Sequence, residues 1–208
     1  MNQMKLKEAQ EQFFRRYPDG FSDSQMIAIT KKHKVEKMKK MAQDSFALEQ
    51  FASPANIVAS MSKIVSQSSL ISVFEKPKFK EFVNSISDQE KEQLAKGLKE
   101  FLYGDQEAGF ELMAGLLGKY KLAKWPLLTV YGIYFRPDEE VFIKPTTVKK
   151  IIECFELTGL TYSSAPTFAF YQAYREQIKQ LKQRAEVSLQ VDNAAFCGFL
   201  MLSIESIT

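Results

Sequence analysis

The side chains best suited to chemistry lie between Arg136 and Lys150, where basic and hydroxyl residues gather around a proline. Pro145 predicts a helix start, because proline is favoured in the first turn of a helix. The backbone N–H groups of a first turn attract anions, and neighbouring ammonium groups add positive charge. The sequence therefore offers an anion-binding corner, for which the candidate residues are Arg136, Lys144, Thr146, Thr147 and Lys149. An ordinary surface helix explains the same residues without a ligand.

A second basic stretch runs from Lys31 to Lys40 and contains six lysines and one glutamate. Lys31, Lys34 and Lys37 recur every third residue, so on one helix they wind around the axis. Such a stripe can follow a phosphate backbone. It contains no aromatic residue on which bases stack. Two interpretations remain open, a stripe that binds an anionic partner and a solvated helix surface.

Residues for nucleophilic catalysis or zinc binding are scarce. His33 is the only histidine and is flanked by lysines, whereas a catalytic histidine packs against a nucleophile and an orienting carboxylate. Cys154 and Cys197 form no zinc-binding motif, and we expect free thiols in a reducing compartment. We therefore predict a protein that is not an enzyme, with no catalytic residue, no bound metal and no cofactor.

The acidic triplet at 138–140 is the one alternative that involves a metal. Adjacent carboxylates can hold magnesium in a hydrolase or nuclease. A polar turn is the simpler interpretation of these three residues.

Composition favours a globular chain with an aromatic core. The 208 residues include 17 Phe and 8 Tyr, and the formal net charge is only +3. This small charge is compatible with a nucleic-acid partner and does not require one. The N-terminus lacks the apolar segment of a signal peptide. The longest apolar run, Ala194 to Leu202, is far shorter than the roughly 20 residues of a membrane span. We expect a soluble cytoplasmic protein with no membrane partner.

Helical signals dominate the elements that must position these residues. Residues 53–120 have the apolar spacing of a compact helical array, with a capping box at Ser87 and Glu90 and a cap at Asp105. Another helix is predicted from Ser24 to about Gln50, and Asp192 is expected to cap the last one. The stretch from Leu127 to Ile143 fits either a small β-hairpin or a buried helix after Pro126.

Two motifs resemble a group of uncharacterised bacterial cytosolic proteins of similar length. They are F-F-x-x-Y-P-x-G-F at 13–21 and F-x-K-P-T at 142–146, and the region from Leu160 to Tyr171 extends the likeness over most of the chain. No activity is assigned to that group, so the resemblance implies no catalytic residue. It implies that the two motifs belong to one surface.

These observations predict a mainly α, multi-helix orthogonal bundle that forms a single domain over residues 1–208. Residues 1–50 would form a helical arm or hairpin that packs on residues 51–208, and one small hairpin near 130–143 is an open option. The leading hypothesis is a binding protein for an anionic partner such as nucleic acid. A protein–protein interaction or regulatory module and a metal-dependent hydrolase are the alternatives. The oligomeric state does not follow from the sequence.

Overall fold

The computed structural model describes residues 1–207, with the side chains of residues 1–204. Within that range the chain forms eleven α-helices and three short 3-10 helices, and it contains no β-strand. The predicted mainly α class, a multi-helix bundle, is therefore confirmed.

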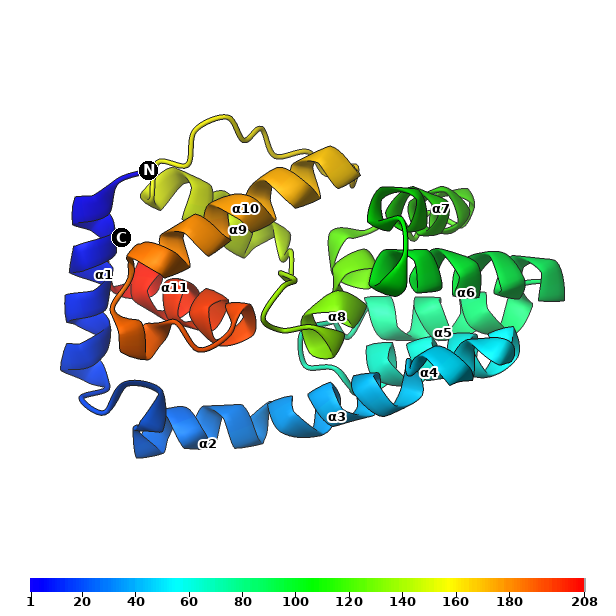
Figure 1. Cartoon of the computed structure of the whole chain (residues 1–208), viewed down its shortest axis with the longest axis horizontal. Helices are drawn as coiled ribbons and strands as arrows, with labels where there is room; N and C mark the ends of the chain where they lie inside the picture. Colours follow the sequence, from blue (N-terminus) through cyan, green and yellow to red (C-terminus); the bar gives the residue numbers. More distant parts are fainter. Residues whose placement is uncertain (208) are drawn as a thin grey trace.

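The helices form two groups that lie side by side (Figure 1). The central group contains α4 (Pro54–Gln67), α5 (Glu75–Ser85), α6 (Asp88–Tyr103), α7 (Gln106–Lys119) and α8 (Trp125–Phe135). The terminal group contains α1 (Gln3–Arg16), α9 (Pro145–Cys154), α10 (Phe168–Arg184) and α11 (Asn193–Ile207). Along one side, α2 (Ser24–Lys32) and α3 (Val35–Ser45) run from the terminal group to the central group. The 3-10 helices are η1 (Gly20–Ser22), η2 (Leu48–Ala52) and η3 (Val187–Leu189).

Local capping signals fix several helix starts as predicted. Ser87 and Glu90 form a capping box at the start of α6, in which the Glu90 carboxylate accepts the Ser87 backbone N–H at 3.0 Å. Asp105 and Asp192 each accept the backbone N–H three residues further on, at 3.0 Å and 2.6 Å. A cap of this kind typically stabilises a helix by ~1 kcal/mol.

The prediction of one helix over residues 24–50 is wrong, because the chain breaks at His33 and Lys34. Lys34 has φ 53° and ψ 36°, the left-handed conformation that non-glycine residues rarely adopt. Lys31 therefore belongs to α2 and Lys37 to α3. The predicted stripe of three lysines around a single helix axis is therefore wrong.

The optional β-hairpin near 130–143 is also wrong, and the alternative of a buried helix is correct. Trp125–Phe135 is helical, and residues 136–144 have no regular secondary structure. Pro126 lies in the first turn, where its missing N–H costs nothing. Every residue from Trp125 to Tyr134 is buried. Side chains that favour strands by type thus pack on all faces of a helix, and packing overrides propensity.

An aromatic-rich core passes through both groups. The ring centroid of Tyr171 on α10 lies 5.7 Å from that of Phe110 on α7 and 5.9 Å from that of Phe101 on α6. Trp125 on α8 lies 5.3 Å from Phe170 on α10. The two groups therefore share one hydrophobic core and hold each other in place.

Candidate functional site

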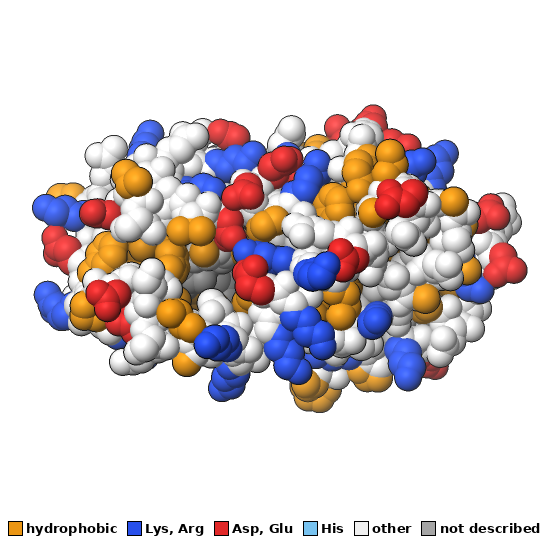
Figure 2. All heavy atoms as spheres, turned by 60° about the horizontal axis from the view of Figure 1, so that its bottom comes forward, with side chains coloured by type: hydrophobic (Ala, Val, Ile, Leu, Met, Phe, Trp, Pro, Cys, Tyr) orange, Lys and Arg blue, Asp and Glu red, His pale blue; other side chains and the backbone are white. Residues whose placement is uncertain are grey.

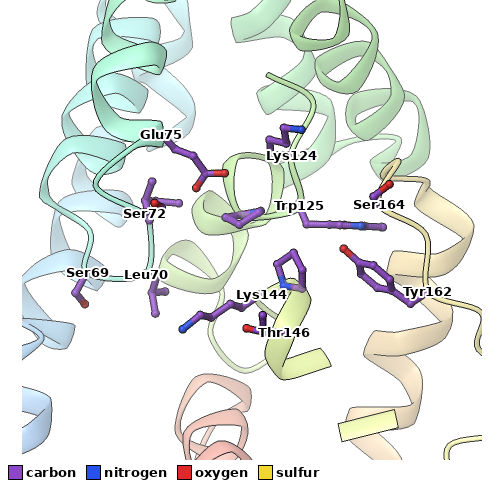
Figure 3. A pocket seen from close by; sticks show the side chains of 13 residues that line it. Ser69, Leu70, Ser72, Glu75, Lys124, Trp125, Lys144, Thr146, Tyr162 and Ser164 are labelled. Atoms are coloured by element: carbon purple, nitrogen blue, oxygen red, sulfur yellow. The ribbon is translucent and has the colours of Figure 1, made fainter. Parts of the chain in front are cut away.

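A cavity of about 580 Å³ opens between the central and terminal groups. The central group contributes the loop after α4, the first residue of α5 and the start of α8; the terminal group contributes the start of α9 and the loop before α10. The lining residues are 69–72, Glu75, 124–126, 144–146, Tyr162 and Ser164. Figure 3 shows their side chains converging from both groups. The volume falls in the range of about 300–1,000 Å³ that is usual for small-molecule sites.

Of the three helices that begin at this cavity, α8 and α9 begin in an unusual way. Lys124 is the N-cap of α8 and Lys144 is the N-cap of α9, and each helix has a proline in its first turn. Neither lysine forms a side-chain cap hydrogen bond. An N-cap normally carries a side-chain oxygen, and the positive end of a helix dipole repels an ammonium group. The chain therefore places a positive charge at the N-cap of each helix, where a negative charge would stabilise the helix.

The charged groups of the cavity are not paired with one another. Lys124 and Lys144 are exposed, and neither forms an ion pair with a described carboxylate. Glu75, at the start of α5, is half-buried and also lines the cavity. In Figure 3, Glu75 and Lys124 lie on one side of the cavity, and Lys144 and Thr146 lie on the opposite side.

An aromatic wall closes one end of the cavity. Trp125 is buried, and its Nε1–H donates to the Ser163 carbonyl oxygen at 2.8 Å, which fixes the indole. Tyr162 is half-buried, with its ring edge-on to Phe170 at 5.8 Å. Burial raises the pKa of Tyr162 above its ordinary value. The Tyr162 hydroxyl therefore stays protonated at neutral pH and can donate a hydrogen bond.

The predicted residues of α9 are distributed around this cavity. Lys144 and Thr146 line it, and Thr146 does not cap the helix because Lys144 occupies the N-cap position. Thr147 is half-buried and lies one residue beyond the lining. Lys149 is exposed and places Nζ 4.9 Å from the centroid of the Tyr162 ring. Three of the four residues thus lie in or directly against the cavity wall.

The corner between α2 and α3 contacts the rim of the cavity. His33, at the corner between α2 and α3, places Nδ1 2.9 Å from Ser69 Oγ, and Ser69 lines the cavity. Lys31, Lys34 and Lys37 are exposed. Figure 2 shows the side of the molecule along which α2 and α3 run, where lysine and arginine side chains alternate with acidic and hydrophobic ones. The corner that carries Lys34 therefore lies beside the rim of the cavity, but this face is not uniformly basic.

Arg136 is not part of the cavity and instead belongs to a buried polar cluster around Glu140. The Glu140 side chain is 1% exposed. Its Oε1 accepts from Arg136 and Gln106, both at 2.8 Å, and its Oε2 accepts from Arg175 at 2.7 Å and Tyr171 at 2.6 Å. We call these five residues the Glu140 joint. Its members come from α7, the end of α8, the loop that follows it, and α10, so the joint ties the central group to the terminal group.

Further hydrogen bonds reinforce this connection. Asn193, the first residue of α11, donates its side-chain N–H to the Glu140 carbonyl oxygen at 3.1 Å. Lys39 on α3 pairs with Asp192 at 2.7 Å, and both side chains are largely buried. Burial and the Glu140 carboxylate raise the pKa of Tyr171 well above its ordinary value, so this phenol remains a donor. The joint is a structural arrangement in which the carboxylate oxygens are fully engaged.

The acidic triplet does not form a metal site. The Glu140 carboxylate forms ion pairs with two arginines. Glu139 is exposed, and its Oε2 lies 3.5 Å from Arg136 Nη1. No group of three His, Cys, Asp or Glu side chains within the described part of the chain could hold a metal ion. A polar turn with one buried carboxylate accounts for residues 138–140.

The two cysteines are free and partly buried. Burial raises the pKa of the Cys197 thiol to about 12 and also raises that of Cys154. Both are therefore weak nucleophiles at neutral pH. None of the described helices combines the length and the apolar character that crossing a membrane requires.

Sequence reasoning did not identify Lys124, Glu75 or Tyr162 as cavity residues. Lys124 carried a usable signal, because it precedes a first-turn proline by two positions in K-W-P at 124–126, much as Lys144 precedes Pro145 by one. Glu75 and Tyr162 carried none, since only the packing of the two groups brings them to the cavity.

The comparisons with known proteins give no relative: no family model, no curated protein and no solved structure matches the chain. The first motif, at 13–21, is largely explained by packing. Phe13 and Tyr17 are buried. The centroid of the Phe13 ring lies 5.6 Å from that of Phe21 and 5.2 Å from that of Phe199. Only the second motif, through Lys144 and Thr146, contributes to the cavity.

Proposed function

We propose that this protein binds a small anionic ligand in the cavity between the central and terminal groups, and we assign it no catalytic residue. The observation that carries the proposal is the pair of helix starts at Lys124 and Lys144. The N-terminus of each helix carries about half a positive charge. Two such termini and two lysines that lack an ion-pair partner border one half-open cavity.

An anion in that space resolves a local electrostatic conflict. Without it, each ammonium group is repelled by the dipole of the helix that it precedes. A carboxylate or phosphate accepts hydrogen bonds from first-turn N–H groups and pairs with the lysines. The hydroxyls of Thr146 and Tyr162 provide further donors. Conflicts between local stability and sequence are expected at functional sites.

Thermal unfolding with a panel of anions tests this proposal. Inorganic phosphate, phenyl phosphate and benzoate are titrated, since a ligand that binds the folded state raises the melting temperature with its concentration. For at least one anion we expect a melting temperature that rises with the logarithm of the anion concentration, and we expect this rise to be lost in the Lys124→Met/Lys144→Met double variant. The matched control is Lys96→Met/Lys99→Met, which removes two exposed lysines of α6. Equal binding by the cavity variant and the wild type would contradict the proposal.

A nucleic-acid backbone is the second candidate partner. The contact between His33 and Ser69 favours it, because this contact brings the corner that carries Lys34 beside the rim of the cavity. Fluorescence anisotropy with labelled duplex DNA, single-stranded DNA and RNA across a salt series measures the effect. A steep loss of affinity with salt would report how many phosphates are neutralised. Binding that persists unchanged in Lys31→Met/Lys34→Met/Lys37→Met would exclude this surface.

The protein-interaction alternative has one observation in its favour. Val73 and Phe74 are 71% and 77% exposed, and they lie on the loop whose earlier residues line the cavity. A second copy of the chain is the simplest partner to test. Sedimentation velocity should then detect self-association that Phe74→Ser abolishes, and a concentration-independent monomer would remove that partner.

A further inference from the structure

Glu75 is the feature of the cavity that a purely anionic ligand leaves unexplained. Its carboxylate points into the space in Figure 3 and forms no ion pair with a described cation. Its position in the first turn of α5 is favourable to the helix. For a bound anion, however, a half-buried like charge in the same cavity is repulsive. A ligand that also carries a positive group converts this repulsion into attraction.

The cavity also has an apolar floor between its charged ends. Leu70, Ile71, Trp125, Pro126 and Pro145 line it together with the charged residues. Trp125, Ile71 and Pro126 are buried, so the accessible apolar surface comes mainly from Leu70, which is 36% exposed, and from the half-buried Pro145. An apolar group of a ligand would be removed from water here, which is favourable.

We infer that the ligand is a small zwitterion with an apolar portion, such as an α-amino acid with an apolar side chain. Its ammonium group meets Glu75, its carboxylate meets Lys124 or Lys144, and its side chain lies on the apolar floor. This inference rests on the proposed function and narrows its ligand class. The three parts of the ligand correspond to three chemically different parts of one cavity.

Matched probes separate a zwitterion from a simple anion. Phenylalanine, 3-phenylpropanoate and 2-phenylethylamine share one aromatic side chain, and the last two lack the amine and the carboxylate respectively. Leucine, 4-methylpentanoate and 3-methylbutylamine form the aliphatic equivalent. Isothermal titration calorimetry with the full chain should show an amino acid that binds at least tenfold more tightly than either of its two truncated forms.

Two variants assign the charges. Glu75→Gln keeps the size of the side chain and removes its charge, so we expect it to abolish the tenfold preference for the amino acid over the deaminated acid. Lys144→Met should weaken the binding of both the amino acid and the deaminated acid. A wild-type protein that binds the acids as tightly as the amino acids would overturn the inference, as would an undiminished preference in Glu75→Gln.

The outcomes also separate this inference from the function on which it rests. Binding of phosphate or benzoate without any binding of phenylalanine or leucine would contradict the inference of a zwitterionic ligand and would support the proposed anion-binding function. Absence of binding for every probe overturns both.

Discussion

The Glu140 joint and the cavity both contain acidic and basic side chains, but these side chains are paired in the joint and unpaired in the cavity. In the joint, one buried carboxylate engages two guanidinium groups, an amide and a phenol. In the cavity, two lysines and one glutamate share a space without pairing. Charges that satisfy one another inside a protein stabilise its structure, and charges left unpaired around a cavity are available to a ligand. Substitutions in the two regions should therefore affect stability with opposite signs.

The largest effect is expected at the centre of the joint. Glu140→Ala leaves Arg136 and Arg175 without their buried partner, and breaking a buried pair typically costs about 3–5 kcal/mol. Urea denaturation of the wild type and the variant measures the loss. Glu139→Ala is the control, because its side chain is 61% exposed and pairs of this kind contribute about 0–1 kcal/mol. Similar losses in both variants would mean that the joint does not hold the two groups together.

The next effect compares two buried phenols that undergo the same chemical change. Tyr171→Phe removes a donor to a charged carboxylate, at a typical cost of about 1.5–3 kcal/mol. Tyr131→Phe removes a buried hydroxyl that has no hydrogen-bond partner, so it should be neutral or stabilising. The urea denaturation midpoints of the two variants, each compared with that of the wild type, measure this difference in stability. A destabilised Tyr131→Phe would indicate that its hydroxyl has a partner such as bound water.

Alkaline pH should weaken the joint. Tyr171 has a pKa raised above 10.0 by burial and by Glu140, so above pH 10 it ionises in the unfolded chain before it does so in the folded one. The unfolded state then binds fewer protons, and the free energy of unfolding falls by up to about 1.4 kcal/mol per pH unit. This contribution is present below pH 10 and disappears as the pH rises towards the folded pKa.

Denaturation between pH 8 and pH 11 isolates this contribution. The difference in stability between the wild type and Tyr171→Phe should shrink above pH 10, while Glu139→Ala should follow the wild type. Burial also raises the pKa of Tyr131. The stability of Tyr131→Phe relative to the wild type should therefore also increase above pH 10, although this variant is not destabilised at neutral pH. A constant difference across the range would contradict the raised pKa of Tyr171.

The smallest effect has the opposite sign and lies in the cavity. Lys124→Asp and Lys144→Asp each place a favourable oxygen and charge at a helix N-cap, and we expect each to stabilise the free protein by about 0.5–2 kcal/mol. Both should weaken the binding of anionic probes. Lys150→Asp, exposed on the same α9 but beyond its first turn, should change stability by less than about 0.5 kcal/mol. Destabilised N-cap variants would show that the lysines have a structural role.

The sequence predicted what depends on neighbouring residues. The caps at Ser87 and Asp105 and the helix start at Pro145 all follow from spacing within a few positions. Such features need no knowledge of the rest of the fold. Lys144 and Thr146 line the cavity, while anion binding by them stays a prediction.

The features that were missed depend on distant residues. Glu140 looked like part of a polar turn, because its partners on α7 and α10 lie 31 to 35 positions away. The break at Lys34 has no glycine or proline to mark it. The helix over Trp125–Phe135 is decided by burial on every side, which a single sequence does not display.

The packing of α1 against α11 has a consequence for the order of folding. Leu6, Ala9 and Phe13 bury the inner face of α1, and the Phe13 ring meets Phe199 on α11. Nearly the whole chain separates these partners, and synthesis proceeds from the N-terminus. We expect α1 to remain undocked on the ribosome until α11 emerges, while the short connections of α4 to α8 allow those helices to assemble first. Docking of α1 on α11 then follows the assembly of the helices that lie between them in the sequence.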